Sequence, residues 1–294
     1  MRILTYRGYG QQHYRSTRAL VSLFNFQYMR TGLWIFFVVG GLTLHGQEYE
    51  SLHIEKSKNP DSDNRVFTAG KGQVYQVSIY ESNTQKTLVF TENDWDLLEA
   101  SEAPAANAVD KIIYLTASVK NAKRTNKRQT EVIIAYEPHG RTFDNTGIVE
   151  NEQNIWLHPP RNRFFKILEL CPFPFVKLSS DSLAWTDKLR IRGNWQDDRW
   201  ATWEGDLVLD LSYTQSGYEI LETNLGEFNC LTTKSTAESR LGETFLKTYF
   251  HPEYGFVKME YEILGKYDVV LELVEVKDFG SMQSPGDYLL KKRG

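Results

Sequence analysis

The sequence has few cysteines and contains none of the catalytic motifs that short patterns can reveal. Two cysteines occur in 294 residues, too few for the disulfide frameworks that hold small secreted domains together. The chain contains no GxSxG elbow, Walker loop or GxGxxG loop, and its histidines form no HxH or HxxxH pair for a metal. We therefore expect a protein that is not an enzyme and that holds no metal and no cofactor.

Lysine and acidic residues are absent from residues 1–46, which carry five arginines and the apolar run LWIFFVVGGLTL at 33–44. A basic region followed by an apolar core and small residues is typical of a secretory signal, and this core is shorter than the roughly 20 residues of a membrane span. We expect export to the periplasm or the cell exterior, cleavage near Gly46 and no stable membrane span afterwards. Alternatives are a retained anchor, a mitochondrial presequence and a translation start at Met29.

The remainder of the chain is acidic. The net charge is −4 and the leader arginines account for +5, so residues 47–294 carry −9. We expect no nucleic-acid partner, because phosphates favour clustered lysine and arginine. The one dense basic run, at residues 120–128, is interpreted as the solvated end of a hairpin. Hydrophobic residues make up 41% of the chain, which is enough for a sizeable core.

The chain divides into four segments. Residues 1–46 are the signal or leader segment, residues 47–70 a polar linker, residues 71–279 a single antiparallel β domain, and residues 280–294 a flexible tail. Alternation of apolar and polar residues with period two is typical of half-buried strands. The segments that favour strands are 73–80, 86–91, 111–119, 130–136, 188–192, 206–213, 217–223, 227–233, 255–263 and 267–276.

Two segments favour short helices. Residues 93–100 begin with an asparagine suited to an N-cap and continue with acidic residues in the first turn. Residues 160–171, bounded by prolines, place Phe164, Phe165 and Leu168 at helical spacing. The second helix would offer an apolar face to a sheet.

Short turns join several of the predicted strands, for example at 215–217 and 265–266. Connections this short cannot hold a crossover helix, so neighbouring strands should be antiparallel. We predict a mainly β domain, a curved antiparallel sheet or half-barrel with one or two short covering helices. The helix at 160–171 would pack on its concave side.

Histidines and acidic clusters outside the predicted strands have ordinary explanations. His139 and His158 lie next to prolines in predicted loops and are interpreted as surface histidines. Residues 61–64 begin like a calcium loop but lack the glycine and the glutamate that the loop needs further on. Residues 196–199, QDDR, are interpreted as a solvated loop.

The two cysteines, Cys171 and Cys230, each lie among apolar residues. Such a position suits a free buried thiol, which packs as a small apolar group. The alternative is a disulfide, since both residues would remain in the exported chain. We predict free thiols.

Aromatic and basic side chains are concentrated between residues 185 and 203. The group comprises Trp185, Arg190, Arg192, Trp195, Arg199, Trp200 and Trp203. Aromatic rings beside guanidinium groups suit stacking on sugars or flat rings, or the anchoring of a partner protein. The candidate binding residues are therefore Trp195, Arg199, Trp200 and Trp203. The alternative is that these tryptophans cover one end of the β core.

Four phrases follow one another in the last third of the chain: DLVLDLSY at 206–213, ETNLGEFNC at 222–230, AESRLG at 237–242 and YFHPEYGFVK at 249–258. Together they resemble a group of secreted hypothetical proteins from Bacteroidetes-type bacteria and, more distantly, the periplasmic TapB-like family of uncharacterised proteins. That family is similar in architecture to the lipoprotein carriers LolA and LolB. The resemblance implies an antiparallel half-barrel covered by helices, and it brings no catalytic residues.

These observations predict an exported, non-catalytic envelope protein that binds an apolar ligand in its half-barrel or binds an envelope protein partner. One alternative is a structural or interaction module with a filled core, and another is a hydrolase with a dispersed site. An empty apolar cavity inside the sheet would favour the first reading, and a packed interior with an exposed aromatic patch the second. Carboxylates or histidines converging in a cleft would favour the third.

Overall fold

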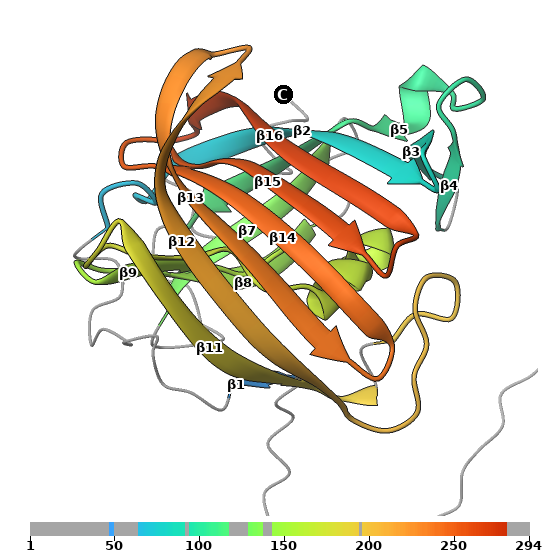
Figure 1. Ribbon diagram of the computed structural model, residues 1–294. Coiled ribbons are helices and arrows are strands. Elements are labelled where there is room, and N and C mark those ends of the chain that lie inside the picture. The colour runs from blue at the N-terminus through green and yellow to red at the C-terminus, as the bar shows by residue number, and fades with distance from the viewer. Residues whose placement is uncertain are drawn as a thin grey trace, which may run out of the picture. The chain divides into compact units, whose positions relative to one another are not determined.

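The fold is known from a computed structural model. It describes residues 47–49, 64–91, 94–117, 129–137, 143–193 and 196–280. As predicted, it is mainly β, and the strands form one curved antiparallel sheet (Figure 1). Several predictions lie outside the described residues: the leader, the calcium-loop-like stretch, the basic run at 120–128, His139, Trp195 and nearly all of the tail.

Sixteen strands and two short 3₁₀-helices make up the described fold. The strands of the N-terminal half are β1 (Gln47–Tyr49), β2 (Lys71–Glu81), β3 (Thr84–Phe90), β4 (Trp95–Glu99), β5 (Ala108–Val109), β6 (Lys111–Thr116), β7 (Thr130–Glu137) and β8 (Phe143–Glu150). Those of the C-terminal half are β9 (Asn154–Leu157), β10 (Phe175–Lys177), β11 (Ser182–Ile191), β12 (Leu207–Thr223), β13 (Gly226–Ser239), β14 (Gly242–His251), β15 (Gly255–Ile263) and β16 (Tyr267–Asp278). The helices are η1 (Ala105–Asn107) and η2 (Arg163–Leu170).

The strands are hydrogen-bonded in the order β1-β11-β12-β13-β14-β15-β16-β2-β6-β7-β8-β9-β10, and β3 extends from β2 to carry β4 and β5. Two runs of consecutive strands, β6 to β10 and β11 to β16, therefore form the two halves of the sheet. They meet through β2, which pairs with β16 on one side and with β6 on the other. The sheet is complete only when segments from the two ends of the domain lie side by side.

The side chain of Gln215 hydrogen-bonds β12 to β10, near the end of the other half of the sheet. Gln215 on β12 is buried, and its amide accepts a hydrogen bond from the Lys177 backbone N–H at 3.1 Å. The same amide donates to the Lys177 carbonyl at 2.9 Å and to the Ser180 carbonyl. One edge of β10 pairs with β9 through backbone hydrogen bonds. On its other edge, the Gln215 side chain supplies the hydrogen bonds instead.

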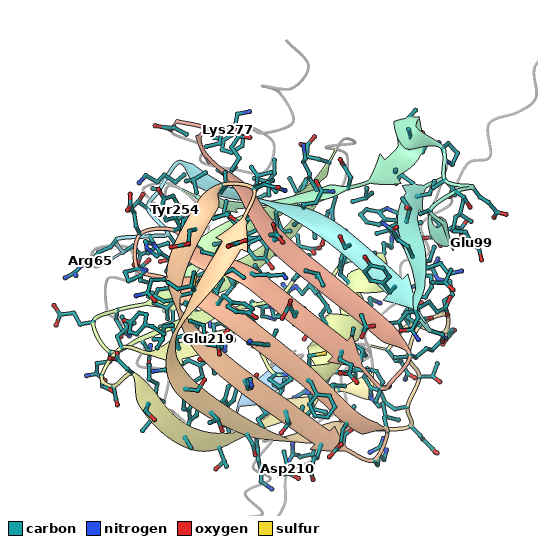
Figure 2. The ribbon with its side chains drawn as sticks, turned by 45° about the horizontal axis from the view of Figure 1, so that its top comes forward. Arg65, Glu99, Asp210, Glu219, Tyr254 and Lys277 are labelled. Carbon is teal, nitrogen blue, oxygen red and sulfur yellow. The ribbon has the colours of Figure 1, made fainter. Side chains whose placement is uncertain are left out.

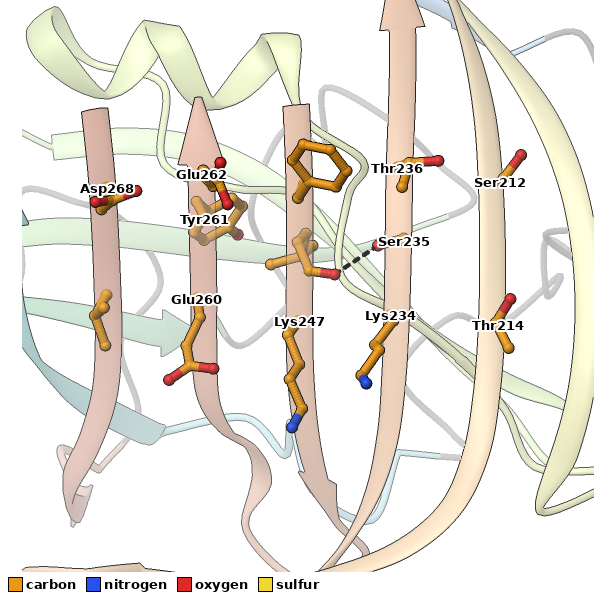
Figure 3. Close-up of a pocket in the computed structure, with 13 residues that line it drawn as sticks. Ser212, Thr214, Lys234, Ser235, Thr236, Lys247, Glu260, Tyr261, Glu262 and Asp268 are labelled. Atoms are coloured by element: carbon orange, nitrogen blue, oxygen red, sulfur yellow. Dashed lines mark hydrogen bonds between the residues drawn. The ribbon is translucent and has the colours of Figure 1, made fainter. Parts of the chain in front are cut away.

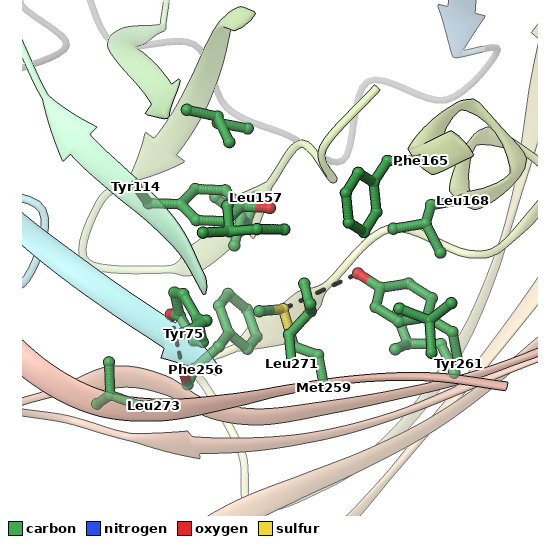
Figure 4. Packing of buried hydrophobic residues seen from close by; sticks show 14 of the residues in the cluster. Tyr75, Tyr114, Leu157, Phe165, Leu168, Phe256, Met259, Tyr261, Leu271 and Leu273 are labelled. Atoms are coloured by element: carbon green, nitrogen blue, oxygen red, sulfur yellow. Dashed lines mark hydrogen bonds between the residues drawn. The ribbon is translucent and has the colours of Figure 1, made fainter. Parts of the chain in front are cut away.

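Alternation of side chains along the strands separates a packed inner face from an outer face. On β15, Val257, Met259, Tyr261 and Ile263 are buried, while Glu262 between them is exposed. The inner side chains of both halves pack against each other (Figure 4). Each half therefore supplies one wall of a common core.

The predicted helix at 160–171 is confirmed as η2, although it forms a 3₁₀-helix. Phe164, Phe165 and Leu168 are fully buried. Phe165 stacks on Tyr136 with ring centroids 5.6 Å apart, and Phe164 meets Tyr267 edge to face at 5.5 Å. The helix thus covers strands of both halves. Within the described part of the chain, no helix has the length and apolar character that a membrane crossing requires.

Two predictions of local structure are wrong. Residues 93–100, predicted as a helix, contain strand β4, because Trp95 is buried against Tyr136 at 4.9 Å and the segment pairs with β3. The turn predicted at 215–217 does not reverse the chain. It is a bulge within the single long strand β12, where Gly217 has a φ of +91°.

The segment predicted as a linker, residues 47–70, contributes to the described fold. β1 pairs with β11 at the edge of the sheet. Phe67 is buried, and the Glu150 carboxylate accepts three hydrogen bonds from consecutive backbone N–H groups at 65–67, at 2.7–2.9 Å. Polar composition concealed this role, because its partner Glu150 lies far away in the sequence.

Candidate functional site

The predicted binding residues that the structure describes are engaged in packing and ion pairs. Trp200 lies edge to face on Phe164 of η2, with ring centroids 5.1 Å apart. The Arg199 guanidinium lies over the Trp200 ring at 5.0 Å and forms an ion pair with Asp94 at 3.0 Å. Trp203 is 8% exposed. Together these side chains fasten the loop after β11 to η2 and β4.

Trp185 and Trp203 belong to one buried hydrophobic cluster and Trp200 packs against another, so the tryptophans do not form one exposed surface. The Trp185 ring stacks on Tyr213 with centroids 4.9 Å apart and planes 2° apart. Phe175 of β10 meets the same ring edge to face, and the Lys177 ammonium lies over it at 4.9 Å. These aromatic contacts lie beside the Gln215 junction and add apolar packing between β10 and β12.

The outer face of β12 to β16 is hollowed into a groove of about 630 Å³ (Figure 3). Its outward-pointing lining side chains are Ser212, Thr214, Lys234, Thr236, Phe245, Lys247, Glu260, Glu262, Asp268 and Val270. Phe245 is 37% exposed, an unusual position for a phenylalanine in the middle of a sheet face. Hydroxyl, ammonium and carboxylate groups therefore surround an accessible aromatic ring.

The β12–β13 hairpin extends beyond the neighbouring strands and bends toward this outer face (Figures 1 and 2). The bulge at Gly217 allows the bend, because a second residue on β12 opposes one on β13. Beyond it, Glu219 forms an ion pair with Lys247 of β14 at 3.0 Å, and Phe228 packs against Tyr254 at 5.1 Å. The hairpin is thereby held at the Lys247 side of the groove.

The other side of this hairpin is apolar and exposed. Tyr218 and Ile220 are 47% and 60% exposed, and Leu225 lies at its tip. Tyr218 and Ile220 are two residues apart in a strand and therefore point the same way. They form the exposed apolar patch of the hairpin.

A second cluster of functional groups is buried rather than accessible. Glu169 of η2 is fully buried, and its carboxyl lies 3.7 Å from the His158 Nε2. The His158 Nδ1 makes a hydrogen bond of 2.8 Å with the Pro159 carbonyl, so Nδ1 carries the proton when the ring is neutral. The interpretation of His158 as a surface histidine is wrong, because the ring packs between Phe173 and Trp156.

The distance between Glu169 and His158 suits an ion pair, yet burial keeps both groups neutral at neutral pH. Burial raises the pKa of the Glu169 carboxyl to about 8, against a smaller opposing effect of the Arg161 charge. Burial and then the Arg161 charge lower the pKa of the His158 imidazole to about 3. The contact therefore joins a carboxylic acid and a neutral imidazole, since the desolvation of two charges would outweigh their attraction.

Polar groups next to this pair form a connected network. Tyr136 donates a hydrogen bond to the Asp144 carboxyl, which also accepts one from the Arg161 backbone N–H at 3.1 Å. Burial raises the pKa of Asp144 although both hydrogen bonds oppose the shift. The network therefore lies in a region where charge is costly.

The described residues contain no group of three His, Cys, Asp or Glu side chains that could hold a metal ion. Cys171 and Cys230 are both free and buried, which confirms the prediction for the thiols. Burial raises the pKa of both thiols, to about 11 for Cys230. A raised thiol pKa keeps the thiolate population low, so neither residue is set up as a nucleophile.

The groove was not predicted from the sequence. The sequence shows the outward charged residues but not that they lie close together. Lys234, Lys247 and Glu262 occupy outward positions in alternating strands, which alone indicates ordinary solvated faces. Their convergence follows from the register of β13, β14 and β15. The register depends on a bulge between Tyr249 and Phe250 that no local pattern reveals.

The fold and groove define a class: a curved antiparallel sheet closed over a short helix, with an open site on its outer face. No protein-family model matches the chain, and no curated protein matches it. Among solved structures it is similar to a protein from Bacteroides fragilis described as a "putative exported protein with YmcC-like fold". That match has 10% identity and a TM-score of 0.38 and covers 71% of this chain and 96% of the other.

A "putative lipoprotein" from Parabacteroides distasonis is similar at 12% identity with a TM-score of 0.37. That match covers 74% of this chain and 100% of the other. The "hypothetical lipoprotein YmcC" from Escherichia coli is similar at 11% identity with a TM-score of 0.32, covering 69% and 83% of the two chains. Identities and TM-scores this low carry no conclusion about the activity or ligands of this chain.

Proposed function

We propose that the protein is an exported envelope protein that acts by binding, with its ligand site in the groove on the outer face of β12 to β16. The leader supports export, because its basic region, apolar run and small residues occur in the order of a secretory signal. The groove supports binding. Its location on the outer face replaces the half-barrel interior that the sequence suggested.

The observation that carries the proposal is the groove itself. At about 630 Å³ it has the volume of a small-ligand site. Phe245 supplies apolar surface at its centre, and the polar groups around it come from five adjacent strands. A rigid sheet holds these groups in place, so that little order has to be gained on binding.

A binding role accounts for the buried acid and imidazole better than catalysis does. Burial raises the pKa of the Glu169 carboxyl to about 8, but the residue is fully buried. A substrate could reach it only if η2 left the sheet, which would expose Phe164 and Phe165. We assign the pair to the closed interior of the fold and not to a catalytic site.

The alternative is an apolar ligand inside the sheet. It was suggested by the sequence and by the resemblance to the TapB-like family and to LolA and LolB. The inner face is filled by η2 and by aromatic rings in the described residues, which weakens this alternative and supports a module with a filled core. A second candidate function is the docking of an envelope protein partner on the exposed apolar patch of the hairpin, Tyr218 and Ile220.

Native mass spectrometry of the protein purified from the envelope of its own host tests the proposal. We expect a bound adduct on the native chain and its loss in Thr236→Trp, because an indole at this position would fill the groove. The matched control is Thr84→Trp, an exposed threonine on β3 outside the groove. The control should keep the adduct.

Two outcomes would contradict the groove. A lipid-sized adduct that persists in Thr236→Trp would support the interior site instead. If no adduct is present, and if a protein partner is lost only in Tyr218→Ser with Ile220→Ser, the interaction module would be the better description.

A further inference from the structure

Charges of like sign lie directly opposite each other on the floor of the groove. Lys234 of β13 is opposite Lys247 of β14, and Glu262 of β15 is opposite Asp268 of β16. Like charges in opposite positions destabilise a pair of strands. Glu260 of β15 is opposite Lys247 and forms an ion pair with Lys258 at 2.8 Å, so the two like-signed pairs are the part of the arrangement that sheet stability does not explain.

Most of these charges lack a partner within the described residues. Lys247 is paired with Glu219 at 3.0 Å. Lys234, Glu262 and Asp268 form no ion pair with any described residue. One ammonium and two carboxylates are therefore available to a ligand.

The two charge centres lie apart, with Phe245 and Glu260 between them. The lysine pair and the carboxylate pair are two strand spacings apart and one row apart along the strands, which places them about 12 Å apart at the sheet surface. Phe245 is directly opposite Glu262 and next to Thr236, between the two centres. Figure 3 shows the lysines side by side and the carboxylates Glu262 and Asp268 further along the same face.

We propose that the groove binds a short free peptide of about three residues, with its C-terminal carboxylate at Lys234 and Lys247 and its N-terminal ammonium at Glu262 and Asp268. An extended tripeptide spans about 10 Å between its charged ends. Its central side chain would lie on Phe245. This inference rests on the proposed function, because it assigns a ligand class to the same groove.

The spacing argues for a peptide rather than a zwitterionic lipid headgroup. In an ethanolamine headgroup a two-carbon link separates phosphate and ammonium, so both charges would fall near one centre and leave the other unpaired. The free tripeptide satisfies both centres. The charges of Lys234, Glu262 and Asp268 would then each face an opposite charge of the peptide.

Isothermal titration calorimetry with Ala-Leu-Ala tests the inference directly. We expect the peptide with free termini to bind to the mature protein, and its acetylated and amidated form, which lacks both charges, to bind at least about tenfold more weakly. Rising salt should weaken the binding of the free form, because both contacts are between partly exposed charges.

Charge-removing variants locate the two ends. Lys234→Gln should weaken binding of the free peptide about fivefold and should not affect the amidated peptide, which lacks the carboxylate. Glu262→Gln should weaken binding of the free peptide and should not affect the acetylated one. The matched controls, Lys71→Gln and Glu227→Gln, remove exposed charges outside the groove and should leave both affinities unchanged.

Equal binding of the free and doubly blocked peptides would overturn the inference, as would failure of the free peptide to bind at millimolar concentration. If the peptide fails while the host adduct is still lost in Thr236→Trp, the groove remains the site and only its ligand class is wrong. If Thr236→Trp leaves peptide binding intact, the groove is not the site.

Discussion

Glu169 and His158 show how burial governs the chemistry of single residues in this fold. The Glu169 pKa is raised from an ordinary 4.5 to about 8, so the folded protein keeps a proton that the unfolded chain releases between these values. The His158 pKa is lowered from 6.5 to about 3, so the unfolded chain takes up a proton that the folded protein refuses. The two residues therefore oppose each other in their effect on stability.

The contribution of these two residues to the free energy of unfolding should consequently have a flat maximum. We expect this contribution to rise from pH 3 to 4.5 through His158, to stay level up to 6.5 where the two effects cancel, and to fall from 6.5 to 8 through Glu169. Asp144, whose pKa burial also raises, adds a loss of stability above its ordinary pKa. Each limb has a slope of at most about 1.4 kcal/mol per pH unit. Urea unfolding at half-unit pH steps measures it.

Single substitutions separate the acidic rise from the alkaline fall of the pH dependence. Glu169→Gln should remove the fall above pH 6.5, and His158→Gln should remove the rise below pH 4.5 and expose the fall from there onward. If Glu169→Gln leaves the alkaline limb unchanged, another group is responsible for it.

Phe165 and Phe245 form a matched pair of phenylalanines in opposite surroundings. Phe165 of η2 is fully buried against Tyr136, whereas Phe245 lies exposed in the groove. Phe165→Ala should lower the free energy of unfolding by about 3–5 kcal/mol, because it leaves a cavity. Phe245→Ala should cost less than about 1 kcal/mol. Urea denaturation compares them, and equal costs would contradict the assignment of their faces.

At the level of the elements, the hydrogen bonds between β10 and β12 come from one amide, that of Gln215. Gln215→Leu keeps the volume of the side chain but leaves the Lys177 N–H and carbonyl without their partner. We expect a loss of about 1–3 kcal/mol in the free energy of unfolding and faster hydrogen exchange at the Lys177 amide. The control is Gln85→Leu on the exposed side of β3. Slow exchange at Lys177 in Gln215→Leu would show that β10 is held by other contacts.

Local pattern predicted some of the elements whose neighbours are close in the chain, but it missed β14, which short turns join to β13 and β15. β15 and β16 alternate regularly and are joined by a short turn, so strand, turn and inward face were all readable. β4 was missed because Trp95 is fixed by Tyr136, and no local propensity reports that contact. β8 to β10 were not predicted, because their buried residues, such as those of β9, form short apolar runs without alternation. The groove could not be predicted, because it depends on register between strands.

For the whole molecule, export sets the first residue of the mature chain. Cleavage near Gly46 would place the new N-terminus at Gln47, the first residue of β1. Intact-mass measurement of protein from the envelope should therefore give a chain beginning close to residue 47. A chain beginning at Met1 or Met29 would contradict cleavage.

The pairing of β2 with β16 has a consequence for the time course of synthesis. The ribosome releases β2 early, but one of its two long edges faces a strand from residues 267–278. Until those residues emerge, β2 carries unpaired backbone groups that could join a second copy of the chain. Assembly of the two halves is thus a late event that depends on the last strand, and a chain truncated before β16 would keep an open, aggregation-prone edge throughout its lifetime.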